Sequence, residues 1–172
     1  MKLGAISLPE LRELRIITGG LDKKNVAAIC AAKWPKLEKL ELWFGSKSYG
    51  ANTTMKDLMP ILDGKAFPAL KHLALRNCEL ADELAAALPN AKIVKQLESL
   101  DLSKGMMTEA GVKSLAAGKA ALAHLSRLDL SDNFLGAAEK LASTITKQVR
   151  TKPQRKGYES NGEIHRYVAL GE

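Results

Sequence analysis

The sequence predicts an α/β protein built as a solenoid of repeated strand–helix units, and three observations support this fold class. The motif Leu-x-x-Leu-x-Leu begins at Leu37, Leu70, Leu97 and Leu125, and a variant with one isoleucine begins at Leu11. The copies follow one another at intervals of 26, 33, 27 and 28 residues, the length of one supersecondary unit. Segments with helical spacing of apolar residues lie between them. We therefore expect five repeats in a single domain that spans 1–172.

Each repeat is expected to begin with a short strand. The last two apolar residues of the motif alternate with polar ones, so they point to the same side of an extended chain. One strand and one helix have a single apolar face that they cannot bury alone, so the units stack with their strands parallel. The predicted inward pairs are Leu14/Ile16, Leu40/Leu42, Leu73/Leu75, Leu100/Leu102 and Leu128/Leu130.

Between the strands, apolar residues recur at three- and four-residue steps, as on the buried face of a helix. Thr108 stands just before one of these segments and is expected to cap its first turn. The five predicted helical faces fall within residues 26–31, 58–62, 80–88, 112–116 and 135–145.

This repeat resembles that of leucine-rich repeat proteins, and its helices and period near 28 place it closest to the ribonuclease-inhibitor-like class. In that family an Asn or Cys follows the motif and lies inside a turn, where it bonds backbone groups. Cys78 and Asn133 match those structural turn positions. The resemblance implies a horseshoe arc with parallel strands on the concave side and helices on the convex side. The chain also resembles a group of uncharacterised bacterial leucine-rich repeat proteins, a likeness that implies no activity.

Two segments interrupt the period. The second repeat contains a polar loop at 45–54, and the last interval contains 147–162, which is rich in Lys, Arg and Gly. We interpret 147–162 as a mobile basic loop and expect a closing strand near 166–170. No polar cap precedes the first repeat, so its apolar end is predicted to be available for self-association.

The chain carries no motif for catalysis or for a cofactor. It has neither a phosphate-binding loop nor a dinucleotide-binding glycine motif, and its three His and two Cys are too widely spaced for a metal site. His72, Ser99 and Asp101 are expected on one face of adjacent strands, but an open sheet provides no oxyanion pocket and does not exclude water. We therefore expect a protein that is not an enzyme and binds no cofactor and no metal.

The outward strand positions would line the concave face that the resemblance implies, and they form the predicted partner-binding surface. Trp43 is the most informative, because Trp and Arg are enriched at binding hot spots. Ile17 and Arg76 on either side would complete an apolar patch with a charged rim. The leading hypothesis is a protein–protein interaction module for a protein partner of unknown identity. The predicted surface comprises Ile17, Trp43, Arg76, Arg15, Glu41, His72, Asp101, Arg127 and Asp129.

The formal net charge of +7 suggests an alternative. Five cations and no acid lie within the ten residues 147–156, and such a segment would bind nucleic acid or an anionic surface with strongly salt-dependent affinity. It lacks interleaved aromatic side chains for base stacking, so nucleic acid is not the expected partner. A third hypothesis is an accessory repeat segment of a larger protein. The cations are Lys147, Arg150, Lys152, Arg155 and Lys156.

The cellular compartment is predicted from the small number of cysteines and the shortness of the apolar runs. Two Cys at 48 positions' separation argue against a disulfide framework and favour a reducing compartment. The N-terminal residues have no apolar core of a signal peptide, and no apolar run reaches the roughly 20 residues that a membrane span requires. We therefore expect a cytoplasmic protein without a membrane partner.

Overall fold

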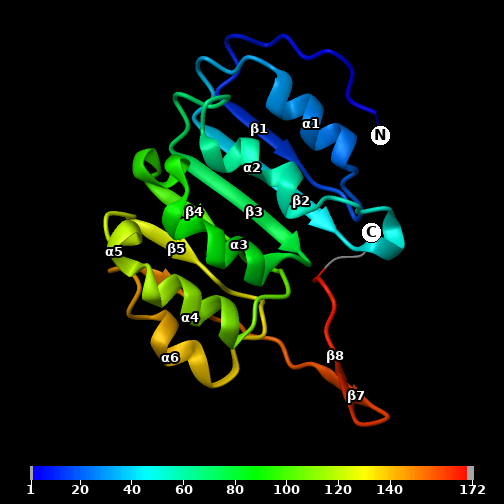
Figure 1. The fold of residues 1–172 in the computed structure, drawn as a ribbon, viewed down its shortest axis with the longest axis vertical. Coiled ribbons are helices and arrows are strands. Elements are labelled where there is room, and N and C mark those ends of the chain that lie inside the picture. The colour runs from blue at the N-terminus through cyan, green and yellow to red at the C-terminus, as the bar shows by residue number, and fades with distance from the viewer. Residues whose placement is uncertain (1, 170–172) are drawn as a thin grey trace.

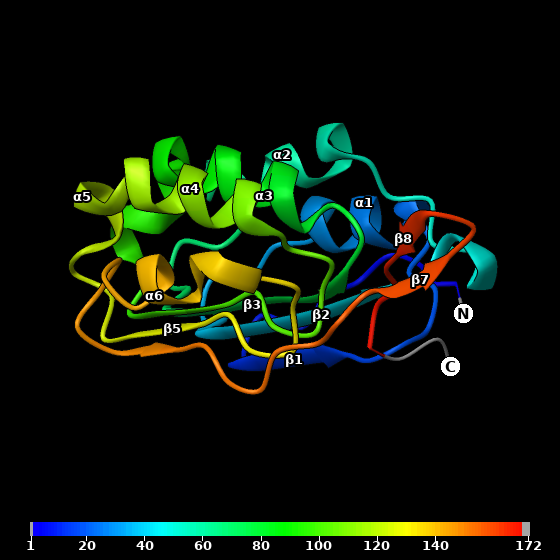
Figure 2. The ribbon, with the colours of Figure 1, turned by 90° about the horizontal axis from the view of Figure 1, so that it is seen from below.

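The computed structural model describes residues 2–169, which form a parallel β-sheet covered by helices on one side (Figure 1, Figure 2). Within these residues the sheet has six strands, and each strand pairs with the next one along the chain. The predicted α/β class with parallel strands is therefore confirmed. The strands are β1 (Glu13–Ile16), β2 (Lys39–Gly45), β3 (His72–Cys78), β4 (Ser99–Asp101), β5 (Arg127–Asp129) and β6 (Val149–Arg150).

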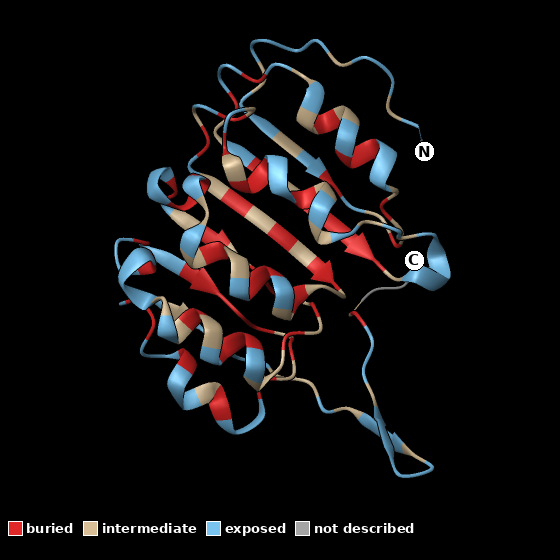
Figure 3. Ribbon diagram, viewed as in Figure 1, coloured by how far each residue is buried: buried red, intermediate tan, exposed pale blue. Residues whose placement is uncertain are grey.

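A ladder of leucines fixes the register of the sheet. The first inward residue of each predicted strand lies beside its counterpart in the next strand, from Leu14 through Leu40, Leu73 and Leu100 to Leu128. From Leu40 onward these side chains are at most 1% exposed. Full burial of one leucine side chain contributes about 2 kcal/mol, so the ladder is a principal source of stability. Figure 3 shows the resulting alternation of buried and half-buried residues along β3.

The helices lie on the side of the sheet toward which the leucines point (Figure 2). Four of the five predicted faces form regular helices, whereas the face predicted within 135–145 forms only a 3-10 turn (Gly136–Ala138) and one turn of α-helix. Thr108 caps its helix as expected, with its side chain accepting from the Ala110 N–H. The helices are α1 (Lys23–Ala31), α2 (Met55–Asp63), α3 (Ala81–Ala87), α4 (Glu109–Ala117), α5 (Lys119–Leu122) and α6 (Glu139–Ala142).

A left-handed backbone turn recurs at the carboxyl-terminal ends of three of the strands. Asn77, Lys104 and Asp132 occupy equivalent places after the inward residues of β3, β4 and β5, and all three have a positive φ of 54° to 66°. Asn and Asp tolerate this left-handed conformation better than other residues with a side chain. Their recurrence at the same place gives the chain a repeat-like backbone beyond the leucine ladder.

The predicted closing strand near 166–170 is wrong for residues 166–169, which form no strand in the described part of the chain. Residue 170 lies outside the described residues. The sixth strand is β6, which the short helix α6 brings back to the sheet much earlier. A single valine, Val149, takes the place of the usual inward pair beside Leu128, so the motif did not reveal this strand.

The segment 147–162 is predicted to be a mobile loop, but it contains two short strands. It contains β6 and then β7 (Tyr158–Ser160), which pairs with β8 (Glu163–His165) in an antiparallel hairpin. The hairpin projects beyond the sheet and the helices (Figure 1). Between β6 and the hairpin, backbone bonds tie Asp132 to Pro153 and Asn133 to Arg155. These bonds fix the segment to the turn after β5.

The N-terminal residues cover part of the first repeat, which was predicted to lack a cap. The Leu3 N–H donates to Asn25 Oδ1 at 2.8 Å, and Leu3, Ile6 and Leu11 pack against the core. Leu8 remains half exposed beside this segment. The apolar end is therefore smaller than the sequence indicated, and self-association through it stays a prediction.

Candidate functional site: the open face of the sheet

In residues 2–169 all the helices cover the same side of the sheet, and we call the other side the open face (Figure 2). Its side chains form three columns, because register aligns equivalent outward positions of neighbouring strands. Eight of the nine predicted surface residues belong to these columns, whereas Ile17 follows the last paired residue of β1. The first column contains Glu13, Lys39, His72, Ser99 and Arg127; the middle one Arg15, Glu41, Ala74, Asp101, Asp129 and Arg150; the third contains Trp43 and Arg76.

Trp43 lies on the open face but is not exposed, contrary to the prediction. It is only 7% exposed. Its Nε1–H donates to Glu41 Oε1 at 2.6 Å, the Arg76 guanidinium carbon lies 4.7 Å from the ring centroid, and Lys104 Nζ lies 6.0 Å from it. Stacking of cations on the indole ring is favourable and hides the ring from water. Ile17 is 55% exposed, but the Trp43 ring is covered by Arg76 and Lys104, so the predicted exposed apolar patch of Ile17 and Trp43 does not form.

Arg76 links three strands across the open face. Its Nη1 donates to Glu41 Oε1 at 3.0 Å, its Nε donates to Ser103 Oγ at 3.0 Å, and the same Nε lies 3.4 Å from Asp101 Oδ2. Arg15 Nε adds a bond of 2.7 Å to the other oxygen of Glu41. Burial acts to raise the pKa of Glu41, but the bonds from Trp43, Arg76 and Arg15 outweigh it, so the pKa lies below its ordinary value. Glu41 is thus a charged acceptor that holds this part of the face rigid.

A more deeply buried carboxylate of the face is Asp129, whose side chain is 4% exposed, against 16% for Glu41. Its oxygens accept from the Ser131 N–H and hydroxyl at 3.1 and 2.6 Å, and from Arg127 Nη2 at 3.0 Å. Arg150 on the neighbouring strand β6 places its Nη1 3.6 Å from Asp129 Oδ2. Burial acts to raise the pKa of Asp129, but Ser131 and the two arginines reverse the shift and leave it below its ordinary value.

A hollow of about 190 Å³ lies over Ala74, the residue of the middle column with the smallest side chain. His72 Nδ1 and Ser99 Oγ are 2.8 Å apart at its wall. The carboxylate of Asp101 bonds instead to the Ser103 N–H at 2.9 Å and pairs with Arg76, so it does not orient the imidazole. Burial raises the pKa of Asp101 above its ordinary value. The trio is adjacent, as expected, but it is not arranged as a nucleophilic triad.

The five cations of the predicted basic loop differ in exposure. Arg155 departs most from the expected solvated cation, because it is half-buried. Its Nε donates to Asp132 O at 2.8 Å, its Nη2 to Lys104 O at 3.2 Å and also to Gly105 O, and its Nη1 donates to Tyr167 O. The guanidinium also lies 4.5 Å from the Phe134 ring centroid. Arg155 therefore fastens the C-terminal segment to the turns after β4 and β5.

The other four cations of the segment, Lys147, Arg150, Lys152 and Lys156, are exposed. Arg150 belongs to the open face, because β6 places it beside Asp129. Sequence reasoning missed this position, since it assigned the residue to a loop. The alternation of Gln148 and Arg150 around one valine was the available signal, but two residues are too few to predict a strand.

The two predicted turn residues lie inside the protein. Asn133 is fully buried, and its amide group donates to Leu102 O, Leu130 O and Ser131 O and accepts from the Met107 N–H. Cys78 is 2% exposed, and burial raises the pKa of its thiol to about 12. A thiol with that pKa is neutral at pH 7 and is a poor nucleophile or metal ligand.

Residues 2–169 contain neither a cluster of metal ligands nor a helix that could span a membrane. No cluster of three or more His, Cys, Asp or Glu lies where it could hold a metal ion. No helix of the described chain has the length and apolar character needed to cross a membrane.

Comparison with known proteins gives one structural relative to report. No protein-family model matches the chain, and no curated protein matches it. The crystal structure of an uncharacterised Bacteroides fragilis protein is similar, with 28% sequence identity and a TM-score of 0.82. The match covers 88% of this chain and 44% of that one, so this chain spans less than half the length of its neighbour. The likeness supports the parallel-strand α/β fold.

Proposed function

We propose that the chain is a protein-interaction module that binds a partner protein on the open face of its sheet. The observation that carries this proposal is the ordered array of charged side chains on that face. Glu41, Arg76 and Asp129 are fixed by bonds between strands, and their positions are set before any partner arrives. Preorganised side chains lose little conformational freedom on binding, which favours affinity and specificity.

We further propose that the fold is a leucine-rich repeat solenoid of the ribonuclease-inhibitor-like class, with the open face on the concave side of an arc. The leucine ladder, the repeated left-handed turn and the buried Asn133 support this assignment. In such an arc a partner meets several strands at once, so specificity comes from the pattern of side chains rather than from one deep pocket.

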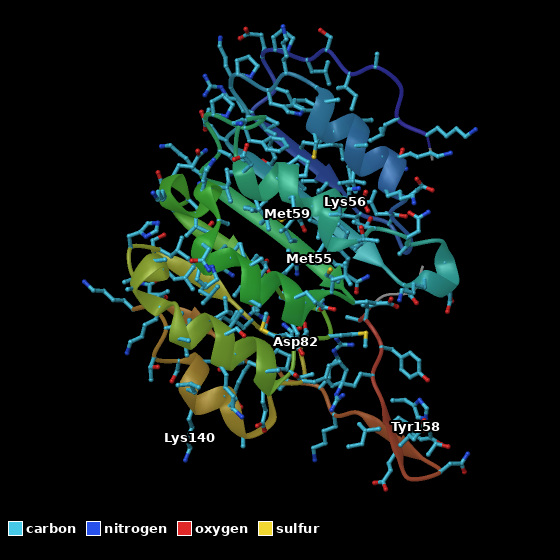
Figure 4. All side chains as sticks on the ribbon, in the orientation of Figure 1. Met55, Lys56, Met59, Asp82, Lys140 and Tyr158 are labelled. Atoms are coloured by element: carbon cyan, nitrogen blue, oxygen red, sulfur yellow. The ribbon has the colours of Figure 1, made fainter. Side chains whose placement is uncertain are left out.

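The test blocks the hollow over Ala74 without disturbing the core. Ala74→Arg places a long side chain on the open face, and Met59→Arg makes the same addition on α2, where Met59 is 53% exposed on the helical side (Figure 4). A partner captured from native cells with the tagged wild type should be lost with Ala74→Arg and kept with Met59→Arg. Equal capture by both variants would rule out the open face as the binding surface.

A further inference from the structure

The exposed charge on the β5–β6 side of the open face is positive. The side chains of Arg127 and Arg150 are 58% and 56% exposed, and Lys147 is exposed just before β6. The carboxylate between the two arginines, Asp129, is only 4% exposed. A molecule that approaches this side therefore meets cations, while the compensating anion lies beneath them.

The two arginines also have more hydrogen-bond donors than Asp129 and the nearby backbone use. The oxygens of Asp129 receive two bonds from Ser131 and contacts from both arginines. Each guanidinium has five N–H donors. Within residues 2–169, Arg127 uses Nη2 toward Asp129, and Arg150 uses Nη1 toward Asp129 and Nε toward Lys152 O. The surface thus offers unused donors to an incoming acceptor.

Arg127 connects this basic side with the hollow over Ala74. It lines that hollow, and it also lines a second, wider hollow of about 490 Å³ beside β6. The second hollow is bounded by Arg127, Lys147, Gln148, Val149 and Arg150. The two hollows share Arg127 as a lining residue, and we call the surface that they mark between Ala74 and Arg150 the track.

We propose that this track binds an extended acidic segment of the partner protein, with partner carboxylates at Arg127 and at the Lys147–Arg150 side. The proposal rests on the open face being the protein-binding surface. A carboxylate fits the unused guanidinium donors in the bidentate manner typical of arginine. The net charge of +7 adds a long-range attraction for an acidic partner.

An acidic protein segment fits this track better than a nucleic acid does. Glu41 and Asp101 stand in the walls of the Ala74 hollow, where they would repel a chain with a phosphate at every residue. A protein segment can place a neutral residue over Ala74 and its carboxylates nearer Arg127. In addition, the ring of Trp43 is covered and offers no surface for base stacking.

The test uses a synthetic peptide of twelve residues with alternating Glu and Ser, and fluorescence anisotropy with the intact protein at about 50 mM salt. Lys147→Gln with Arg150→Gln removes two charges from the track and leaves the Arg127–Asp129 pair in place. Lys56→Gln with Lys140→Gln removes the same charge from the helical side, where both side chains are exposed (Figure 4). We expect about tenfold weaker peptide binding for the first pair and less than about a twofold change for the second.

Four results would overturn the inference. Equal loss with the two variant pairs would show a response to net charge alone. Equal or tighter binding of the matching Lys–Ser peptide would show the wrong sign of charge. Tighter binding of a twelve-nucleotide single strand, lost in the same variant pair, would assign the track to nucleic acid. If Ala74→Arg abolishes partner capture but the protein binds no acidic peptide, the open face remains the binding surface and the acidic segment is rejected.

Discussion

The repeats from β1 to β5 and the C-terminal segment 147–169 are held in place by different kinds of contact. The repeats are held by an apolar ladder in which each leucine packs beside its counterpart in the next strand. The C-terminal segment has few buried apolar residues, and Arg155 ties it to backbone carbonyls of two earlier turns. A strong period in the sequence therefore marks apolar packing, whereas polar attachment to the backbone leaves no period in the sequence.

The largest effect is expected at Asn133, which serves both regions because it lies in the turn after β5. Asn133→Ala would remove the side-chain partner of the Met107 N–H and of Leu102 O, and one of two partners of Leu130 O and of Ser131 O. We therefore expect a loss of about 4 kcal/mol in the free energy of unfolding. Urea denaturation measures this loss, with the exposed substitution Gln148→Ala as control. A loss below about 1 kcal/mol would mean that the turn does not depend on the side chain.

A smaller effect, confined to the C-terminal segment, is expected at Arg155. Arg155→Ala removes the charged bonds to Asp132, Lys104 and Tyr167, at a cost of about 2–3 kcal/mol. Arg155→Lys should restore less than half of this, because one ammonium group cannot reach the same carbonyls. Hydrogen exchange should speed up at the Ala169 N–H, which donates to Lys104 O, before the sheet opens. Full rescue by lysine would contradict this account of the guanidinium.

These two positions show how far sequence reasoning reaches. Asn133 was predicted as an inner turn residue because the resemblance to leucine-rich repeat proteins implies that role for an Asn after the motif. Arg155 was predicted as a loop cation because its partners are backbone carbonyls far away in the sequence, and no side-chain pattern records them. Trp43 was placed on the correct face because it occupies an outward position next to the motif's alternating leucines. Its burial was missed because the covering cations belong to other strands and turns.

A smaller loss of stability than at Arg155 is expected at Asp129, which lies beside Arg150 where the repeats meet the C-terminal segment. Asp129→Asn keeps the volume but replaces a charged acceptor facing Ser131 and two arginines, so we expect a loss of about 1–2 kcal/mol at pH 7.

The pH dependence of that loss follows from the pKa of Asp129, which is lower in the folded protein than its ordinary value. The unfolded chain takes up the proton first as pH falls, so the stabilisation by the carboxylate is present above the unfolded pKa and disappears below the folded one. The difference between wild type and Asp129→Asn should therefore shrink as pH falls below about 4. A constant difference from pH 7 to the acid limit would show that the charge is not responsible.

The smallest effect is expected in the β7–β8 hairpin. Tyr158 is 67% exposed at the start of β7 (Figure 4), so Tyr158→Ala should change the free energy of unfolding by less than about 0.5 kcal/mol. Thermal unfolding of the two proteins side by side provides the measurement. A larger loss would show that the hairpin is part of the cooperative core. The C-terminal segment would then also depend on side-chain packing, as the repeats do.

The most direct test of the open face as the binding surface is a lysine footprint of the protein with and without its captured partner. Acetylation followed by mass spectrometry reports the exposure of each lysine. The account predicts that Lys39 and Lys147, on the open face and at its edge, are protected by the partner, while Lys56 and Lys140 on the helical side react as before. Protection of Lys56 and Lys140 with unchanged reaction of Lys39 and Lys147 would contradict it.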